Sequence, residues 1–143
     1  MARVRESRTF AVPPAELSGL IERDLESFVG ASGVDSVSMT GDRIALASRL
    51  GLASIELVVR IDREADAVLA FDAVDGMFER MRTEYTVEAT DPGSRLVAWT
   101  EFTLGGVIGT ALDETLVSMQ RNREFEYQFD YLETLLDAEA VGP

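Results

Sequence analysis

The sequence contains no cysteine, no histidine and no lysine among its 143 residues. The absence of cysteine excludes disulfides and thiol nucleophiles, and the absence of histidine excludes the usual catalytic triads. Zinc sites built from imidazole and thiolate ligands are excluded as well. Without lysine, the chain forms neither a Schiff base nor the lysine contact of a phosphate-binding loop. Carboxylates are the remaining candidates for catalysis, and we expect no metal site and no cofactor.

Long hydrophobic runs are also missing. No stretch approaches the roughly 18 apolar residues of a membrane-spanning helix, so we expect no membrane span. The basic N-terminal residues are not followed by an apolar segment, which argues against a signal peptide. The length predicts a single domain over residues 1–143, and 46% hydrophobic residues are enough to build a core.

Positive charge is scarce. The formal net charge is −13, and all 13 basic residues are arginine. Repulsion between this chain and phosphate argues against a nucleic-acid partner. The acidity either keeps an ordinary protein dispersed or is an adaptation to molar salt, in which the Debye length falls to about 3 Å. The lack of lysine favours the second explanation, a cytoplasmic protein of a high-salt organism, although a codon bias toward arginine has the same effect.

The order of predicted elements indicates an α+β fold. Residues 3–12 alternate as a strand, which Pro13 and Pro14 end, and two short helices follow. Residues 34–104 contain about six strands joined by tight turns, and residues 107–139 form one long helix. Because the later connections are short, consecutive strands should pair as an antiparallel meander. We expect a curved antiparallel sheet of about seven strands wrapped around the C-terminal helix.

The long predicted helix changes its apolar side halfway along. In its first half, Leu112, Leu116 and Met119 share one face, which we expect to cover a cavity. In its second half the same face becomes acidic, and the apolar side chains reappear on the opposite side. We expect that apolar set to anchor the fold; it consists of Phe125, Phe129, Leu132 and Leu136. The acidic set, which we expect to face water, consists of Glu126, Asp130, Glu133 and Asp137.

Three segments carry a resemblance to a known superfamily. They are VPPAEL at 12–17, VDGMFERM at 74–81 and DPGSRLVAW at 91–99, the last of which precedes the Gly105-Gly106 pair and the long helix. With this order of elements, the chain resembles the helix-grip fold of the START/Bet v 1-like (SRPBCC) superfamily, in particular its polyketide cyclase/dehydrase-like and coenzyme Q-binding-like branches. The resemblance implies an apolar cavity between sheet and helix. Many members have a tryptophan after the second short helix, where this chain has Phe28 as the nearest aromatic residue.

The aromatic and methionine side chains are the candidates to line such a cavity. From the pattern alone they are ordinary core residues, but Met and Phe also suit a site that accepts varied apolar shapes. We therefore expect binding or carriage of a small hydrophobic molecule, such as a lipid, an isoprenoid quinone or a polyketide-like compound, and favour a non-catalytic role. The predicted ligand-binding residues are Phe71, Met81, Tyr85, Phe102, Leu112, Leu116 and Met119.

Glu101 is the candidate catalytic carboxylate, because its orientation depends on strand register. If Thr90 pairs with Arg95, then Trp99 and Glu101 point away from the cavity; a slip by one residue turns both inward. We favour the first register, which buries the apolar residues of that strand together. The remaining sheet carboxylates, most of which we expect to be solvated, are Asp72, Glu79, Glu84 and Glu88.

The Asp75-Gly76 pair predicts a hairpin, but a tight two-residue turn conflicts with the hydrophobic pattern. Such a turn places Ala70 opposite Met81, whereas the pattern favours Leu69 and Phe71 on that face. A glycine bulge at Gly76 would reconcile the two.

Two alternative functions remain open at this point. One is a cyclase- or dehydrase-like enzyme that uses Glu101, together with Tyr85. The other is an interaction module or homodimer formed through the aromatic residues Phe125, Tyr127 and Tyr131, because this aromatic arc is wider than one sheet face requires.

Overall fold

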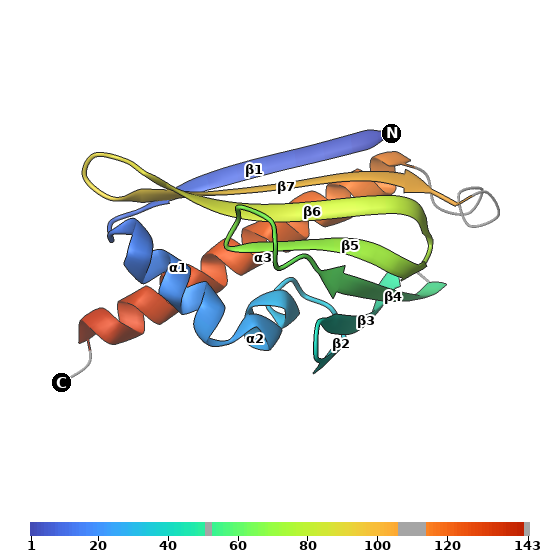
Figure 1. Cartoon of the computed structure of the whole chain (residues 1–143), viewed down its shortest axis with the longest axis horizontal. Coiled ribbons are helices and arrows are strands. Elements are labelled where there is room, and N and C mark those ends of the chain that lie inside the picture. Colours follow the sequence, from blue (N-terminus) through green and yellow to red (C-terminus); the bar gives the residue numbers. More distant parts are fainter. Residues whose placement is uncertain (51–52, 106–113, 142–143) are drawn as a thin grey trace.

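The computed structural model describes residues 1–50, 53–105 and 114–141 (Figure 1). Within them, the strands follow the order β1-β7-β6-β5-β4-β3-β2 in one antiparallel seven-stranded sheet. This confirms the predicted α+β helix-grip fold. The elements are β1 (Ala2–Phe10), α1 (Pro14–Arg23), α2 (Leu25–Gly30), β2 (Ser36–Thr40), β3 (Arg43–Leu50), β4 (Ala53–Ile61), β5 (Leu69–Gly76), β6 (Phe78–Ala89), β7 (Ser94–Leu104) and α3 (Glu114–Val141).

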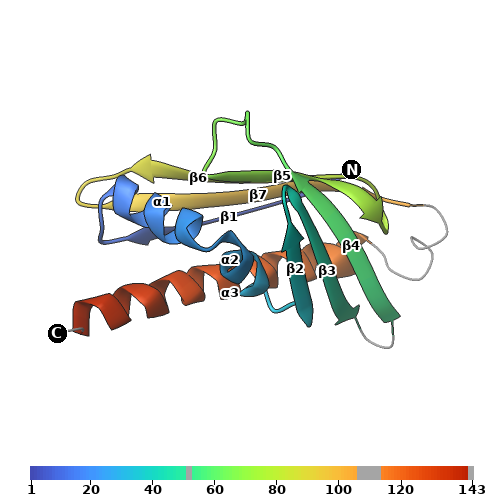
Figure 2. The same ribbon diagram turned by 60° about the horizontal axis from the view of Figure 1, so that its bottom comes forward.

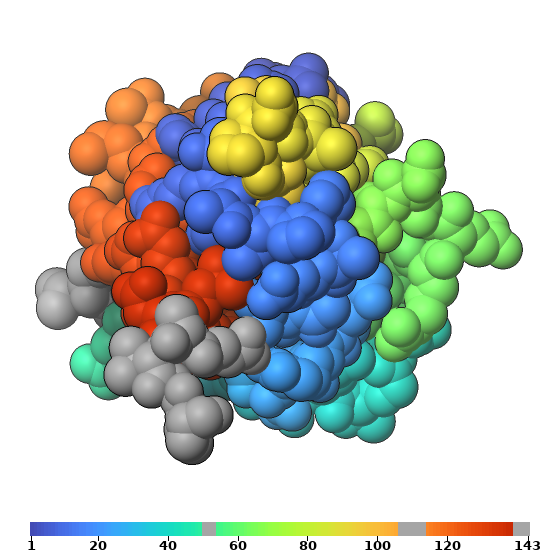
Figure 3. All heavy atoms as spheres, turned by 90° about the vertical axis from the view of Figure 1, so that its left-hand side faces the viewer, coloured from blue at the N-terminus to red at the C-terminus, as the bar shows by residue number. Residues whose placement is uncertain are grey.

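The sheet curves around one side of α3. Figure 2 shows β2, β3 and β4 turning away from the other strands and across the helix. The helix itself packs mainly against β1, with further contacts to β7 and α2. Figure 3 shows α1 and the C-terminal end of α3 side by side at one end of the molecule. The inner face of β3–β6 therefore lies across from the first half of α3, and residues of both line a cavity.

The curvature coincides with irregular pairing around the β5–β6 hairpin. The register of β4 against β5 shifts between Val58 and Val59, and that of β6 against β7 shifts between Phe78 and Arg80. Gly76 has φ +132°, and a Cβ there would lie 2.8 Å from a backbone oxygen of β4. Glycine is therefore required at this bend.

On β5, the hydrophobic pattern prevails over the tight turn. Leu69 lies opposite Tyr85, and Phe71 lies opposite Thr83, so both apolar side chains share the inner face. The residue that separates the two strands is Met77.

The β6–β7 pairing has the predicted faces but a different register. Met81 lies opposite Phe102, and Tyr85 opposite Ala98, two residues away from the expected partners. The four-residue turn comprises residues 90–93, one position earlier than predicted. Inside this turn, a Cβ at Gly93 would come within 2.2 Å of the Phe10 carbonyl oxygen, so the turn packs tightly against the end of β1.

The second half of α3 anchors the fold, as its apolar pattern predicts. Phe125, Phe129 and Leu132 are completely buried. Tyr85 connects this cluster to the sheet and to α2, because its ring makes edge contacts with Phe125 and Phe28 at centroid distances of 5.8 and 5.0 Å. Phe28, on α2, is therefore part of this core.

Arg8 joins β1 to the acidic face of α3. Its guanidinium contacts Glu126 at 2.7 Å, Asp130 at 2.8 Å and Glu133 at 3.3 Å, and it also lies 5.2 Å from the ring centroid of Phe129. Burial alone would lower the pKa of Arg8, but the hydrogen bonds and charges of the three carboxylates outweigh it and raise the pKa. The acidic face is therefore an ion-pair network as well as a solvated surface.

None of the helices in the described ranges is both long enough and apolar enough to cross a membrane.

Candidate functional site

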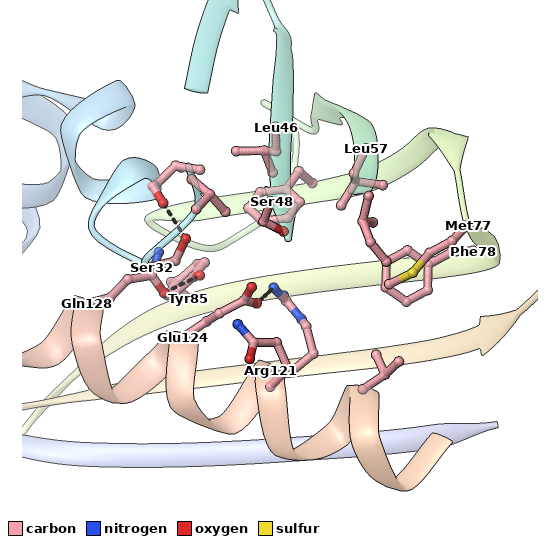
Figure 4. Close-up of a pocket in the computed structure, with 16 residues that line it drawn as sticks. Ser32, Leu46, Ser48, Leu57, Met77, Phe78, Tyr85, Arg121, Glu124 and Gln128 are labelled. Atoms are coloured by element: carbon pink, nitrogen blue, oxygen red, sulfur yellow. Dashed lines mark hydrogen bonds and ion pairs between the residues drawn. The ribbon is translucent and has the colours of Figure 1, made fainter. Parts of the chain in front are cut away.

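A cavity lies between the inner face of the sheet and the first half of α3 (Figure 4). Its volume is about 60 Å³. That is room for a few water molecules, whereas pockets for small-molecule ligands typically enclose about 300 Å³ or more. The side chains around it are Val29, Ser32, Val34, Leu46, Ser48, Ile55, Leu57, Phe71, Met77, Phe78, Tyr85, Val117, Gln120, Arg121, Glu124 and Gln128.

The cavity has an apolar side and a polar side. Strands β3, β4 and β5 supply mainly aliphatic and aromatic side chains, among them Leu46, Leu57 and Phe71. After Val117 in the sequence, the residues that the helix contributes to the lining are all polar. They recur every three or four positions and therefore share one face of the helix. Figure 4 shows Arg121 and Glu124 projecting from α3 toward the cavity, across from the strand that carries Leu46 and Ser48.

Arg121 is held in place by two hydrogen-bonded partners. Its Nη1 forms a short ion pair with Glu124, and its Nη2 donates to the hydroxyl of Thr83 at 2.9 Å. The guanidinium also lies 5.3 Å from the ring centroid of Phe125. The Arg121 and Glu124 side chains are only 13% and 9% exposed, so the pair lies largely out of solvent.

A hydrogen-bonded chain continues from Arg121 into the sheet. The hydroxyl of Thr83 donates to that of Thr100 at 2.9 Å, and Thr100 donates to the carbonyl oxygen of Arg82 at 3.2 Å. Both threonines are fully buried. Because both threonine hydroxyls donate to an acceptor, the two side chains can be buried in an otherwise apolar sheet face.

Tyr85 and Gln128 form the second polar group of the cavity. The phenol donates to Oε1 of Gln128 at 2.7 Å, and Nε2 of Gln128 donates to the carbonyl oxygen of Phe28 at 3.2 Å. Burial raises the pKa of Tyr85 well above its ordinary value, and the charge of Arg121 and the Gln128 bond offset only part of this effect. The phenol is therefore neutral at physiological pH and is suited to hydrogen bonding rather than to proton abstraction.

Of the predicted ligand-binding residues on the sheet, the structure brings two to the cavity. Phe71 and Tyr85 line it. Met81 and Phe102 are buried on the same inner face, but they do not line the cavity; their neighbours are Thr83 and Phe78. They belong to the core next to the site.

The positions expected for the helix residues require a correction. Leu116 and Met119 are 42% and 58% exposed and point away from the cavity, whereas the adjacent Val117 is buried and lines it. The hydrophobic pattern selects the wrong face, because the helix presents mostly polar side chains to the cavity. The remaining candidate, Leu112, lies outside the described residues.

Glu101 points away from the cavity, as the favoured register predicts. It lies on the outer face of β7, where it contacts Arg3 at 3.3 Å and is about one-third exposed. The carboxylate that reaches the cavity is Glu124, which the sequence does not distinguish from other helical glutamates. Its position one turn after Arg121 and one turn before Gln128 is the pattern that could have indicated a polar face.

The outer face of the sheet carries a separate ion-pair cluster around Arg82. Its guanidinium contacts Glu84 at 2.9 Å, Asp72 at 2.8 Å and Asp62 at 3.0 Å. The hydrogen bond to Glu84 is the largest of the effects that raise the pKa of Arg82, and the hydrogen bond from Arg82 in turn lowers the pKa of Asp62. Asp72 and Glu84 are therefore structural groups rather than cavity residues.

Of the three aromatic residues predicted for a dimer contact, the structure exposes only part. Phe125 is completely buried in the core and is therefore not available to a second chain in the folded protein. Tyr127 is 46% exposed, and Tyr131 is partly buried against the core. As for metals, the described part of the chain contains no group of three or more carboxylates arranged as ligands.

Comparison with solved structures identifies the fold. A protein from Thermus thermophilus superposes with a TM-score of 0.75 at 20% identity, covering 99% of this chain and 100% of that chain. The Zhui aromatase/cyclase from Streptomyces sp. R1128 gives 0.74 at 16% identity and 99% coverage of both chains. A START superfamily protein from Mycobacterium smegmatis gives 0.69 at 11% identity, covering 94% of this chain and 97% of that one.

The chain therefore has the START/Bet v 1-like helix-grip fold. No protein-family model matches the sequence, and no curated protein is detectably similar to it.

Proposed function

We propose that the protein binds a small, mainly apolar molecule in the cavity between the sheet and α3. The observation that supports this most directly is the lining itself, which is apolar on the strands and polar on the helix. Such a lining suits a ligand whose body is hydrophobic and whose few polar atoms need orientation. The likeness to a START superfamily protein and to an aromatase/cyclase adds support from proteins of the same fold.

A ligand larger than the present cavity requires its walls to separate. The helix α3 is held mainly by β1, β7 and α2, whereas β3 and β4 lie across the cavity from it. The β3–β4 side can therefore move outward without breaking the contacts that anchor α3. On this account, binding enlarges the 60 Å³ cavity from the strand side.

Native mass spectrometry, with tetralin as the probe, tests this proposal. We expect one tetralin molecule per wild-type chain. Ser48 lines the cavity, so Ser48→Trp should fill it and abolish the adduct. Ser38 is an exposed serine on the neighbouring strand β2, so Ser38→Trp is a matched control that should retain it. Failure of wild-type protein to bind tetralin, or equal retention by the two tryptophan variants, would contradict the proposal.

A cyclase-like reaction is the second candidate, because the cavity contains the carboxylate of Glu124. Its ion pair with Arg121 favours a structural or binding role over proton transfer. Once a compound that the protein converts is found, Glu124→Gln should abolish turnover without abolishing binding if Glu124 is the catalyst.

A further inference from the structure

The polar side of the cavity contains a buried donor that has no partner. Nε of Arg121 is out of solvent and makes no hydrogen bond to any described residue, whereas Nη1 and Nη2 of the same guanidinium both have partners. A buried donor without an acceptor destabilises a protein, so such atoms are rare and call for an explanation.

The guanidinium cannot turn to satisfy this donor without losing a bond that it already makes. Glu124 fixes Nη1 from the next helical turn, and Thr83 fixes Nη2 from strand β6. The ring of Phe125 contacts the same group. The orientation of Nε is therefore set by three residues on two different elements.

Two polar groups close to this site, Thr83 and Gln128, already have hydrogen-bond partners. The hydroxyl of Thr83 accepts a hydrogen bond from Arg121 and donates its own to Thr100. Oε1 of Gln128 accepts from Tyr85, and the amide nitrogen of Gln128 donates to the backbone. No described residue accepts from Nε, and a molecule bound in the cavity would supply the acceptor.

The charge of the site selects the kind of acceptor. Among the described residues that line the cavity, Arg121 is the one basic residue, and its charge is balanced by Glu124. An anionic ligand would add an uncompensated negative charge beside that carboxylate in a poorly solvated space. A carbonyl group accepts a hydrogen bond, adds no charge and brings no donor that would need a partner of its own.

We infer that the ligand is an apolar molecule with a neutral carbonyl group, which accepts a hydrogen bond from Nε–H of Arg121. This inference rests on the proposed function, because it names the polar end of the molecule that the cavity binds. The apolar strands hold the hydrocarbon body, and Arg121 fixes the direction in which the carbonyl points.

Three probes with the same bicyclic frame test the inference: tetralin, α-tetralone and tetralin carboxylate. By isothermal titration calorimetry, wild-type protein should bind α-tetralone about tenfold more tightly than tetralin, a difference of about 1.4 kcal/mol that one hydrogen bond to a charged donor can supply. The carboxylate should bind more weakly than the ketone. In the double variant Arg121→Met/Glu124→Leu, which removes both charges together, the preference for the ketone should disappear. Arg123→Met, an exposed arginine on the same helix, should retain it.

The Nε–H resonance of Arg121 gives a second measurement on the wild-type protein, independent of whether the double variant folds. In ¹H–¹⁵N spectra this resonance should move on addition of α-tetralone and stay in place with tetralin. Equal affinity for the two probes, with an unmoved resonance, would overturn the inference and leave the proposed function intact. A ketone preference that survives in the folded double variant would also overturn it. Failure to bind either probe would overturn the proposed function and this inference with it.

Discussion

The two halves of α3 contact the rest of the molecule in opposite ways. From Phe125 onward, the buried side chains are apolar apart from Gln128, and three acidic ones, Glu126, Asp130 and Glu133, are paired with Arg8. Before Phe125, the inward side chains are mostly polar, and the apolar Leu116 and Met119 are exposed. One half is built to hold the helix in place, and the other presents hydrogen-bonding groups to a cavity.

This difference shows what an apolar stripe on a helix does and does not indicate. In the anchoring half, the stripe marks the buried face, because that face packs against a solid core. In the cavity half, the helix buries Arg121 and Glu124 by pairing them with each other and with Thr83. Variants in the two halves should therefore affect stability for different physical reasons.

The largest expected effect is in the anchoring half. Phe129→Ala should lower the free energy of unfolding by about 3–5 kcal/mol, because it leaves a hole in a fully buried apolar cluster. Urea denaturation measures this. Tyr127→Ala, at an exposed aromatic residue of the same helix, should cost less than about 1 kcal/mol. Equal losses at both positions would break the assignment of this half as the anchor.

The second effect is in the cavity half and depends on pairing rather than volume. Arg121→Met should lower the free energy of unfolding by about 2–3 kcal/mol, because Glu124 is left buried without its cation. Adding Glu124→Leu should recover most of that loss, since the double variant removes both charges. Denaturation of both single variants and the double variant forms a thermodynamic cycle, in which additive losses would show that the pair is not coupled.

Tyr85 connects the two halves and should have a measurable pH dependence. At neutral pH, Tyr85→Phe should cost about 1 kcal/mol through the lost bond to Gln128. Burial raises the folded-state pKa above the unfolded value near 10, so the stability that the neutral phenol contributes is present below about pH 10 and is lost as the pH rises further. Above that pH, wild-type protein should lose up to about 1.4 kcal/mol per pH unit more than Tyr85→Phe. Identical alkaline losses in urea denaturation at pH 9 and 11 would contradict the burial argument.

The smallest effect concerns the ion pairs on the surface of the anchoring half. Arg8→Met should cost about 1 kcal/mol at low ionic strength, because the three carboxylates are partly exposed and each pair contributes little. In molar KCl the Debye length is about 3 Å, so the difference from wild type should shrink. A difference that stays constant with salt in thermal denaturation would assign the role of Arg8 to its contact with Phe129.

The fold could be predicted from the sequence because its main signals are periodic. Alternation along β6 and β7 places Met81 and Tyr85 inside and Glu101 outside, and the structure has these faces. The register differs by two residues, because the alternation repeats every two residues and cannot distinguish turn 90–93 from turn 91–94.

The site could be predicted only in part. Phe71 and Tyr85 follow from their positions on the inner sheet face. Arg121 and Glu124 do not, because an isolated sequence shows them as ordinary charged residues of a helix. Their burial depends on Thr83, which lies 38 positions earlier in the chain, and this contact exists only in three dimensions. Polar residues that face a cavity leave no apolar period by which the sequence could reveal them.

The most direct test of ligand binding in this cavity is the location of the bound probe. With methyl-labelled protein, tetralin should shift the methyl resonances of Val117, Leu46 and Leu57, which line the cavity. The resonances of Leu116 and Met119, on the exposed face of the same helix, should not move. Shifts confined to Leu116 and Met119, or no shifts at saturating tetralin, would contradict the account.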